Sequence, residues 1–176
     1  MHGVLIRDAR VPDEMPVVRA LFEEYAASLD VDLCFQDFDR ELAELPGDYR
    51  APRGSLLVAD VGGRAVGCIA LRPLAGNDAA VGEVKRLYLR VDARGSGAGR
   101  ALAEAVIQRA RAGGYRMLKL DTLASMTAAR TLYASLGFRA CEAYYRNPLP
   151  GVTYMTLDLT STTLGSATVS EVKSKD

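Results

Sequence analysis

The sequence predicts one mixed α/β domain of the α+β kind, on two observations. Apolar residues recur at helical spacing in some segments and form short runs in others, so helices and strands are interspersed. In addition, paired glycines separate two apolar runs in the first half, and a strand–helix–strand pattern spans residues 83–121, which indicates one hairpin and one βαβ crossover. A chain of 176 residues is long enough to bury a core of its own.

The first 50 residues predict one strand and two helices. Residues 3–9 form the strand, and Asp13 is a candidate N-cap for the first helix. One face of that helix is apolar, through Val18, Leu21, Phe22, Tyr25 and Leu29. The second helix carries Phe35, Phe38, Leu42 and Leu45 at spacings of three and four, and it stops at Pro46 and Gly47.

Two strands around Gly62 and Gly63 form the predicted hairpin in residues 54–74, because such turns require a positive φ. Residues 79–91 then predict a long strand. Regular alternation along this strand would place Glu83, Lys85, Leu87 and Leu89 on one face, and Val84, Arg86, Tyr88 and Arg90 on the other.

The second half predicts two further helices between strands. The first begins after a glycine-rich loop and has a small, mainly apolar face that ends at Gly113 and Gly114. A strand over 115–122 precedes a helix over 125–138, which Gly137 closes as a left-handed cap with Phe138 packed behind it. A last strand covers 152–159. The domain therefore spans residues 1–159, and residues 160–176 form a polar tail.

Composition excludes several classes of protein. The 22 basic and 22 acidic residues balance, which argues against a nucleic-acid binder. Apolar runs are too short for a membrane span. Cys34, Cys68 and Cys141 are too widely spaced to indicate a disulfide framework or a metal site. We therefore expect a soluble, cytoplasmic protein that uses no metal and has no nucleic-acid or membrane partner.

The loop RGSGAGR, residues 94–100, is the first candidate functional site. A glycine-rich turn before a helix offers free backbone N–H groups and the positive end of the helix dipole to an anion such as phosphate. A P-loop would need Lys and then Ser or Thr after the last glycine, whereas Arg100 and Ala101 follow here. A dinucleotide fold would place the loop after its first strand, although Asp121 stands near the expected acidic position. A tight turn that uses glycine only for packing remains the alternative.

Residues 83–138 resemble the acetyl-CoA-binding core of the GNAT superfamily of N-acetyltransferases. Its signature is Arg or Gln, two residues, Gly, one residue, then Gly or Ala, and Arg94, Gly97 and Gly99 match it. The later stretch LYASLGF, residues 132–138, resembles the second marker, and the likeness extends over about residues 4–159. The resemblance implies a mixed, mostly antiparallel central sheet with a V-shaped splay, flanked by about four helices.

The resemblance also implies which residues hold acetyl-CoA as cosubstrate. The pyrophosphate would lie on the backbone of the loop, with charge from its arginines; these residues are Arg94, Gly95, Ser96, Gly97, Ala98, Gly99 and Arg100. The pantetheine arm would pair with the backbone of Leu87, Tyr88 and Leu89 where the sheet splays open.

Attack of an amine on a thioester needs a neutral amine and a stabilised leaving thiolate. Glu83 stands eleven residues before Arg94, where several family members carry a base; the alternative is a surface salt bridge to Lys85 or Arg86. Asp121 occupies another such position, or else caps a turn. Tyr133 would support the departing thiolate, or else belongs to the core.

Other residues are less decisive. Many members have an asparagine where this chain has Met126, so part of a cofactor contact is lost or comes from Ser125 or Thr127. Tyr144, Tyr145 and Arg146 would line an acceptor pocket, or else pack at a sheet edge.

The resemblance thus implies transfer of acetyl from acetyl-CoA to a primary amine, favouring a small metabolite, by direct attack in a ternary complex. Alternatives are a non-catalytic acyl-CoA-binding regulatory module, a nucleotide-binding protein, or an enzyme for protein or peptide amines. A homodimer is frequent among such proteins and stays open here.

Overall fold

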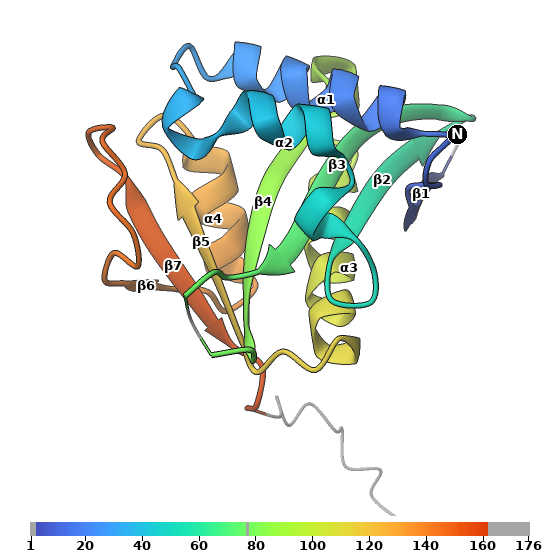
Figure 1. Cartoon of the computed structure of the whole chain (residues 1–176). Helices are drawn as coiled ribbons and strands as arrows, with labels where there is room; N and C mark the ends of the chain where they lie inside the picture. Colours follow the sequence, from blue (N-terminus) through green and yellow to red (C-terminus); the bar gives the residue numbers. More distant parts are fainter. Residues whose placement is uncertain (1–2, 77, 162–176) are drawn as a thin grey trace, which may run out of the picture.

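The computed structural model describes residues 3–76 and 78–161, and it contains a single sheet in the order β1-β2-β3-β4-β5-β7-β6 (Figure 1). Its strands are β1 (Val4–Asp8), β2 (Ser55–Val61), β3 (Arg64–Pro73), β4 (Val81–Leu89), β5 (Met117–Thr122), β6 (Arg139–Cys141) and β7 (Thr153–Asp158). All neighbours are antiparallel except β4 and β5, which are parallel. The predicted mixed, mostly antiparallel sheet with one crossover is confirmed. The predicted polar tail lies outside the described residues from residue 162 onward.

Helices cover both faces of the sheet (Figure 1). The α-helices are α1 (Met15–Ser28), α2 (Phe38–Glu44), α3 (Ala98–Ala112) and α4 (Thr127–Ser135), and the 3-10 turns are η1 (Cys34–Gln36), η2 (Gly47–Tyr49) and η3 (Val91–Ala93). The helices α1 and α2 share one apolar cluster with the sheet, and α3 and α4 share the other. Within the described residues, no helix is both long enough and apolar enough to cross a bilayer.

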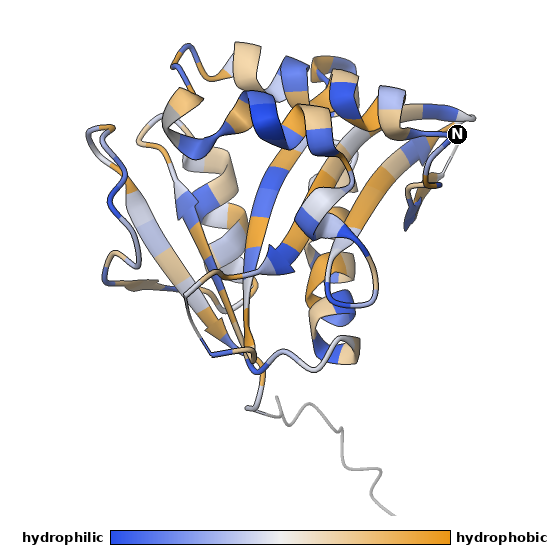
Figure 2. Ribbon diagram, in the orientation of Figure 1, coloured by the Kyte–Doolittle hydropathy of each residue, from blue (hydrophilic) through white to orange (hydrophobic). Residues whose placement is uncertain are grey.

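The two clusters follow from the alternation of side chains along each strand. In β2, Leu56 and Val58 pack under α1, whereas Leu57 and Ala59 pack under α3. Because both faces are covered, nearly every β2 residue is buried, and Figure 2 shows the mainly hydrophobic colouring of β2. The sheet is therefore the rigid layer on which the site is built.

Turn and cap predictions are partly confirmed. Gly62 and Gly63 both have positive φ in the β2–β3 hairpin, and Gly137 has a φ of 96° directly after α4. The predicted N-cap at Asp13 is wrong, because α1 begins after Glu14. The Glu14 carboxylate makes no cap bond to its own helix and instead accepts the Arg10 N–H at 2.8 Å.

The predicted alternation of β4 is also wrong beyond Lys85. Opposite Ile69 of β3 stand two residues of β4, Arg86 and Leu87, and Arg86 has a φ of 61°. This β-bulge puts one extra residue into the strand and reverses its alternation. Leu87 and Leu89 consequently pack on the α3 side with Val84, on the face opposite to Glu83.

Glu14 anchors β1 to the start of α1. Arg7 donates to both of its oxygens, at 2.7 and 2.9 Å, and also reaches Asp60 of β2 at 3.2 Å. The Arg7 hydrogen bonds, followed by the Arg10 backbone N–H, lower the pKa of Glu14 to about 2. A carboxyl whose pKa is depressed on folding contributes stability at pH values above its unfolded pKa.

We expect Glu14→Gln to destabilise the protein by about 2 kcal/mol at neutral pH. Stability of the native protein is lost as the pH falls through the folded pKa, so the difference between the two proteins should shrink from about pH 5 to about pH 2. Urea unfolding at several pH values measures this. Glu44→Gln, which removes an exposed pair with Arg40, should change stability by less than about 0.5 kcal/mol. Equal losses in both variants would contradict the assigned role of Glu14.

Candidate active site

The sheet opens between its two parallel strands. The strands β4 and β5 pair only from Val81 to Glu83 against Met117 to Lys119, and Figure 1 shows them diverging beyond that point. The backbone of β4 after Glu83 therefore has no ladder partner on the β5 side. This is the V-shaped splay implied by the resemblance, and the bulge at Arg86 lies within it.

The glycine-rich loop joins the end of β4 to α3, and it requires glycine for two different structural reasons. Gly95 and Gly97 have φ values of 78° and 85°, and Gly97 is the N-cap of α3. A Cβ atom at Gly99 would instead approach Leu89 Cδ1 to 3.3 Å. Two glycines thus set the turn and the third sets the close approach of α3 to β4, which leaves the exposed loop backbone open to an anion.

Both loop arginines are exposed and have protein partners. Arg94 donates through Nε to the Leu89 carbonyl at 3.3 Å, and Arg100 donates to Ser135 Oγ at 2.6 Å. Arg100 also pairs with Glu104 in the next turn of the helix at 3.4 Å. These contacts place two guanidinium groups at the two ends of the loop.

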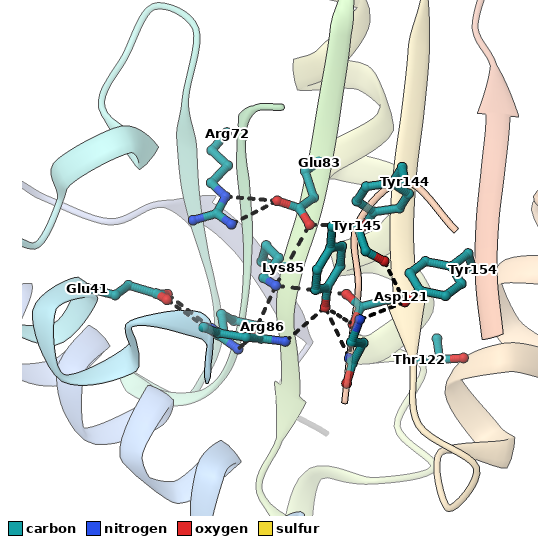
Figure 3. Close-up of polar contacts among 12 residues, drawn as sticks. Glu41, Arg72, Glu83, Lys85, Arg86, Asp121, Thr122, Tyr144, Tyr145 and Tyr154 are labelled. Carbon is teal, nitrogen blue, oxygen red and sulfur yellow. Dashed lines mark hydrogen bonds and ion pairs between the residues drawn. The ribbon is translucent and has the colours of Figure 1, made fainter. Parts of the chain in front are cut away.

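Glu83 lies inside a buried polar cluster beside the splay (Figure 3). Its side chain is 3% exposed. The Oε2 atom of Glu83 lies 2.9 Å from both Nε and Nη2 of Arg72 and accepts a hydrogen bond from Nε. The other oxygen, Oε1, accepts the Tyr144 hydroxyl at 3.0 Å and lies 3.8 Å from Lys85 Nζ. The sequence alternative of a surface salt bridge is therefore wrong in its location, although Lys85 is one partner.

Asp121 belongs to the same cluster from the other side of the splay. Its Oδ2 accepts the Tyr145 hydroxyl at 2.6 Å and the Asn147 amide at 3.0 Å, while Oδ1 lies 3.8 Å from Lys85 Nζ. Lys85 thus joins the two candidate bases, and it donates to Gln36 at 3.1 Å. Burial lowers the pKa of the Lys85 ammonium, against the opposing charge of Glu83.

The bulge residue Arg86 is anchored by α2. Its side chain is 1% exposed and donates through Nε and Nη2 to the two Glu41 oxygens at 3.0 and 2.6 Å. A further N–H donates to Gln36 at 2.9 Å, and the guanidinium lies over the Phe38 ring. A non-glycine residue at positive φ is uncommon, and these contacts offset its cost.

Two pockets meet at this cluster. The larger, about 470 Å³, lies between η1–η2, the β3–β4 connection and the segment with Tyr144 and Tyr145. The smaller, about 30 Å³, lies in the splay; its lining includes Leu87, Asp121, Met126 and Tyr133. After the ligands that the sequence resemblance implies, we name the larger the acceptor pocket and the smaller the thioester cleft. Gln36 and Lys85 line both pockets.

Tyr133 points its ring into the second apolar cluster but borders the thioester cleft. It is 4% exposed and packs edge-on against Phe138 with ring centroids 5.2 Å apart. Within the described part of the chain its hydroxyl makes no hydrogen bond. Burial raises the pKa of this phenol well above its usual value, so the hydroxyl keeps its proton and can donate it in a hydrogen bond.

Comparison with known proteins identifies the family. The model of the acetyltransferase (GNAT) family matches residues 18–138. The chain belongs to the GNAT acetyltransferase family. An uncharacterized N-acetyltransferase of Schizosaccharomyces pombe is 39% identical over 89% of this chain and 96% of the relative, and one of Escherichia coli is 31% identical over 69% and 72%. An acetyltransferase fold from Salmonella typhimurium, solved with acetyl-CoA, superposes with a TM-score of 0.69 at 20% identity over 94% of this chain and 99% of that one.

Membership in the GNAT family makes this protein an acetyl-CoA-dependent acyltransferase. The predicted family, fold and cosubstrate are confirmed. The predicted site residues lie in two places. The candidate catalytic residues line the two pockets; they are Glu83, Asp121 and Tyr133. The residues predicted to pair with the pantetheine arm lie in the splay; they are Leu87, Tyr88 and Leu89.

Several residues of this GNAT site carried no recognisable signal in the sequence. Arg72, Gln36 and Asn147 occur in no motif, and only the pairing of strands brings Arg72 directly opposite Glu83. Of the predicted acceptor residues, Tyr144 and Tyr145 line the acceptor pocket, whereas Arg146 is exposed and does not.

Proposed function

We propose that this GNAT enzyme transfers acetyl from acetyl-CoA to the primary amine of a small molecule, by direct attack in a ternary complex. One observation carries the proposal: the acceptor pocket and the thioester cleft share Lys85 and Gln36 as lining residues. The two pockets therefore adjoin at these side chains, where we place the meeting of the amine and the thioester. The 470 Å³ acceptor pocket suits a small ligand.

The cofactor would enter along the splay. We assign its pantetheine arm to the backbone of Leu87, Tyr88 and Leu89 on the side that faces β5, where β4 has no ladder partner, and its pyrophosphate to the loop from Arg94 to Arg100. The N-terminal end of α3 and two arginine side chains supply the positive potential that a pyrophosphate needs. The reversal of alternation at Arg86 supports this assignment, because it turns the Leu87 and Leu89 side chains into the core.

The chemistry requires loss of a proton from the amine. An alkyl ammonium with a pKa of about 10.4 is almost entirely charged at neutral pH, so a proton acceptor accelerates the reaction. We assign this role to Glu83, which lines the acceptor pocket, directly or through a water molecule. Asp121 lines the thioester cleft, and Lys85 links it electrostatically to Glu83.

The thiolate of coenzyme A must then be stabilised as the C–S bond breaks. The Tyr133 hydroxyl borders the thioester cleft and makes no hydrogen bond within the described residues, and we assign it to the departing sulfur. Its raised pKa means that it donates a hydrogen bond and need not transfer its proton completely. The proton released by the amine balances the charge of the thiolate.

Calorimetric titration with acetyl-CoA, coenzyme A and ATP, followed by thiol release across a panel of amines, tests this function. We expect both coenzymes to bind and ATP not to, with thiol release for one or more small amines. Binding without release for any small amine would overturn the small-molecule assignment, and release only with peptides would move the acceptor to protein amines. Failure to bind coenzyme A would contradict the assigned cofactor path.

We expect Tyr133→Phe to lower kcat by about 10- to 100-fold, with acetyl-CoA affinity nearly unchanged, because it removes one hydrogen bond that forms to the thiolate. Thiol-release kinetics and calorimetry on the same preparation measure the two quantities. Tyr115→Phe is the matched control, since Tyr115 is also buried but donates to the Arg53 carbonyl outside both pockets. An unaltered rate in Tyr133→Phe would return Tyr133 to a purely structural role.

A further inference from the structure

Arg72 presents an unused edge to the acceptor pocket. Its guanidinium contacts Glu83 Oε2 through Nε and Nη2, which occupies one side of the planar group. Nη1 makes no hydrogen bond with any residue in 3–76 or 78–161. The edge formed by Nη1 and the second N–H of Nη2 is therefore open, and Figure 3 shows Nη1 directed away from Glu83. Arg72 lines the acceptor pocket, where its side chain is 27% exposed.

This open edge has the geometry of a carboxylate site. Two parallel N–H groups of an arginine match the two oxygens of a carboxylate, and such charge-assisted pairs are strong and directional. The partial burial of Arg72 reduces the screening that weakens exposed ion pairs. Glu83 and the β3–β4 pairing hold the guanidinium in place before a ligand arrives, which lowers the entropic cost of binding.

The other charged groups of the acceptor pocket are less suited to this role. Lys85 already lies between two carboxylates, those of Glu83 and Asp121, and donates to Gln36. Glu41 is occupied by Arg86 and by the Tyr49 hydroxyl, and Glu44 by Arg40. The Arg40 side chain is 73% exposed, so a carboxylate bound there would be screened by solvent. Asp37 and Asp48 also line the pocket; their negative charge repels a carboxylate, and their exposure to solvent screens this repulsion.

We propose that the acceptor carries a carboxylate as well as its amine, as an amino acid does, and that Arg72 binds this carboxylate. The inference rests on the proposed function and names its substrate class. Glu83 lies between Arg72 and Lys85, so a carboxylate on Arg72 directs the neighbouring amine toward Glu83 Oε1 and the thioester cleft. The amine nitrogen then forms a bond to the thioester carbon, the C–S bond breaks, and the nitrogen gives up its proton as the thiolate leaves.

Matched acceptors test the proposal. Each of the common amino acids is compared with its carboxamide and its decarboxylated amine, and a linear diamine is added, with kcat/KM as the readout. In the native enzyme we expect the best amino acid to exceed its carboxamide by about 10- to 100-fold. Equal or better rates with the carboxamide or the diamine would overturn the proposal while leaving acetyl transfer established.

Variants then locate the preference. We expect Arg72→Gln to reduce the ratio of acid to carboxamide to near one, and Arg72→Lys to keep an intermediate ratio because it keeps the charge but not the planar edge. The two acceptors differ in amine basicity, but this difference is the same for every variant. A change of the ratio on substitution therefore reports on Arg72 and is insensitive to general damage around Glu83. Arg40→Gln should keep the native ratio.

An unchanged ratio in Arg72→Gln would overturn the role of Arg72, and a ratio lost in Arg40→Gln would move the carboxylate to Arg40. If Arg72→Gln does not fold, the acceptor comparison in the native enzyme and Arg72→Lys decide the question. Absence of thiol release with every amine would instead contradict the proposed function, and the carboxylate site would fall with it.

Discussion

Gly97→Val should weaken acetyl-CoA binding by about 100-fold or more, measured by calorimetry. Gly97 is the N-cap of α3 with a φ of 85°, and a Cβ atom there meets no protein atom within 4 Å. The added side chain would therefore project from the exposed loop into the space assigned to the pyrophosphate. In addition, valine disfavours a positive φ, so the loop N–H groups would turn away from a bound anion.

Gly63→Val separates these effects from general destabilisation. Gly63 has a φ of 81° in the β2–β3 hairpin, and its Cβ position is equally open, so the backbone cost is matched at a site away from the loop. We expect both variants to lose similar stability in urea unfolding, and only Gly97→Val to lose cofactor affinity. A folded Gly97→Val protein with native affinity would contradict the assignment of the loop.

Glu83→Gln should lower kcat by about 100-fold, because general base catalysis typically contributes at least that factor. The substitution keeps the shape of the side chain and an oxygen for Arg72, but it removes the group that accepts the proton of the amine. Acetyl-CoA affinity should change little, since Glu83 lies on the acceptor side of the cluster. Steady-state thiol release at saturating acceptor, together with calorimetry, measures the two effects.

Asp121→Asn provides the comparison that distinguishes the two carboxylates. We expect a smaller loss than in Glu83→Gln, because Asp121 lines the thioester cleft, whereas Glu83 lines the pocket assigned to the amine. Glu142→Gln is the control, since Glu142 is exposed and close in sequence to the same tyrosines. A larger loss in Asp121→Asn would transfer the role of base to Asp121, and a native rate in Glu83→Gln would exclude Glu83.

Local features of the chain were readable without a structure. The glycines of the 94–100 loop have to be close together in sequence, because a left-handed turn and a helix N-terminus are local conformations. The cap at Gly137 and the hairpin at Gly62 and Gly63 are predictable for the same reason. The spacing of Arg94, Gly97 and Gly99 therefore identified the family correctly before any contact was known.

Sequence patterns do not predict the irregular part of the ladder between β3 and β4. Simple alternation placed Glu83 and Leu87 on one face of β4, but the bulge at Arg86 separates them. Nothing in the local sequence indicates this bulge, since it depends on Glu41 and Gln36, which lie 45 and 50 residues away in the chain. Arg72 likewise meets Glu83 only through the register of β3 and β4.

The sequence by itself determined the order of helices and strands, the glycine-rich turn before α3 and the family, because each depends on residues near one another in the chain. Only the tertiary structure decided which groups of the site lie together. Lys85 lies between Glu83 and Asp121, one edge of the Arg72 guanidinium is open, and the two pockets meet at Gln36. These features arise from strand register and from helix packing onto the sheet. Both are set by the summed burial of many distant side chains, which no short motif records.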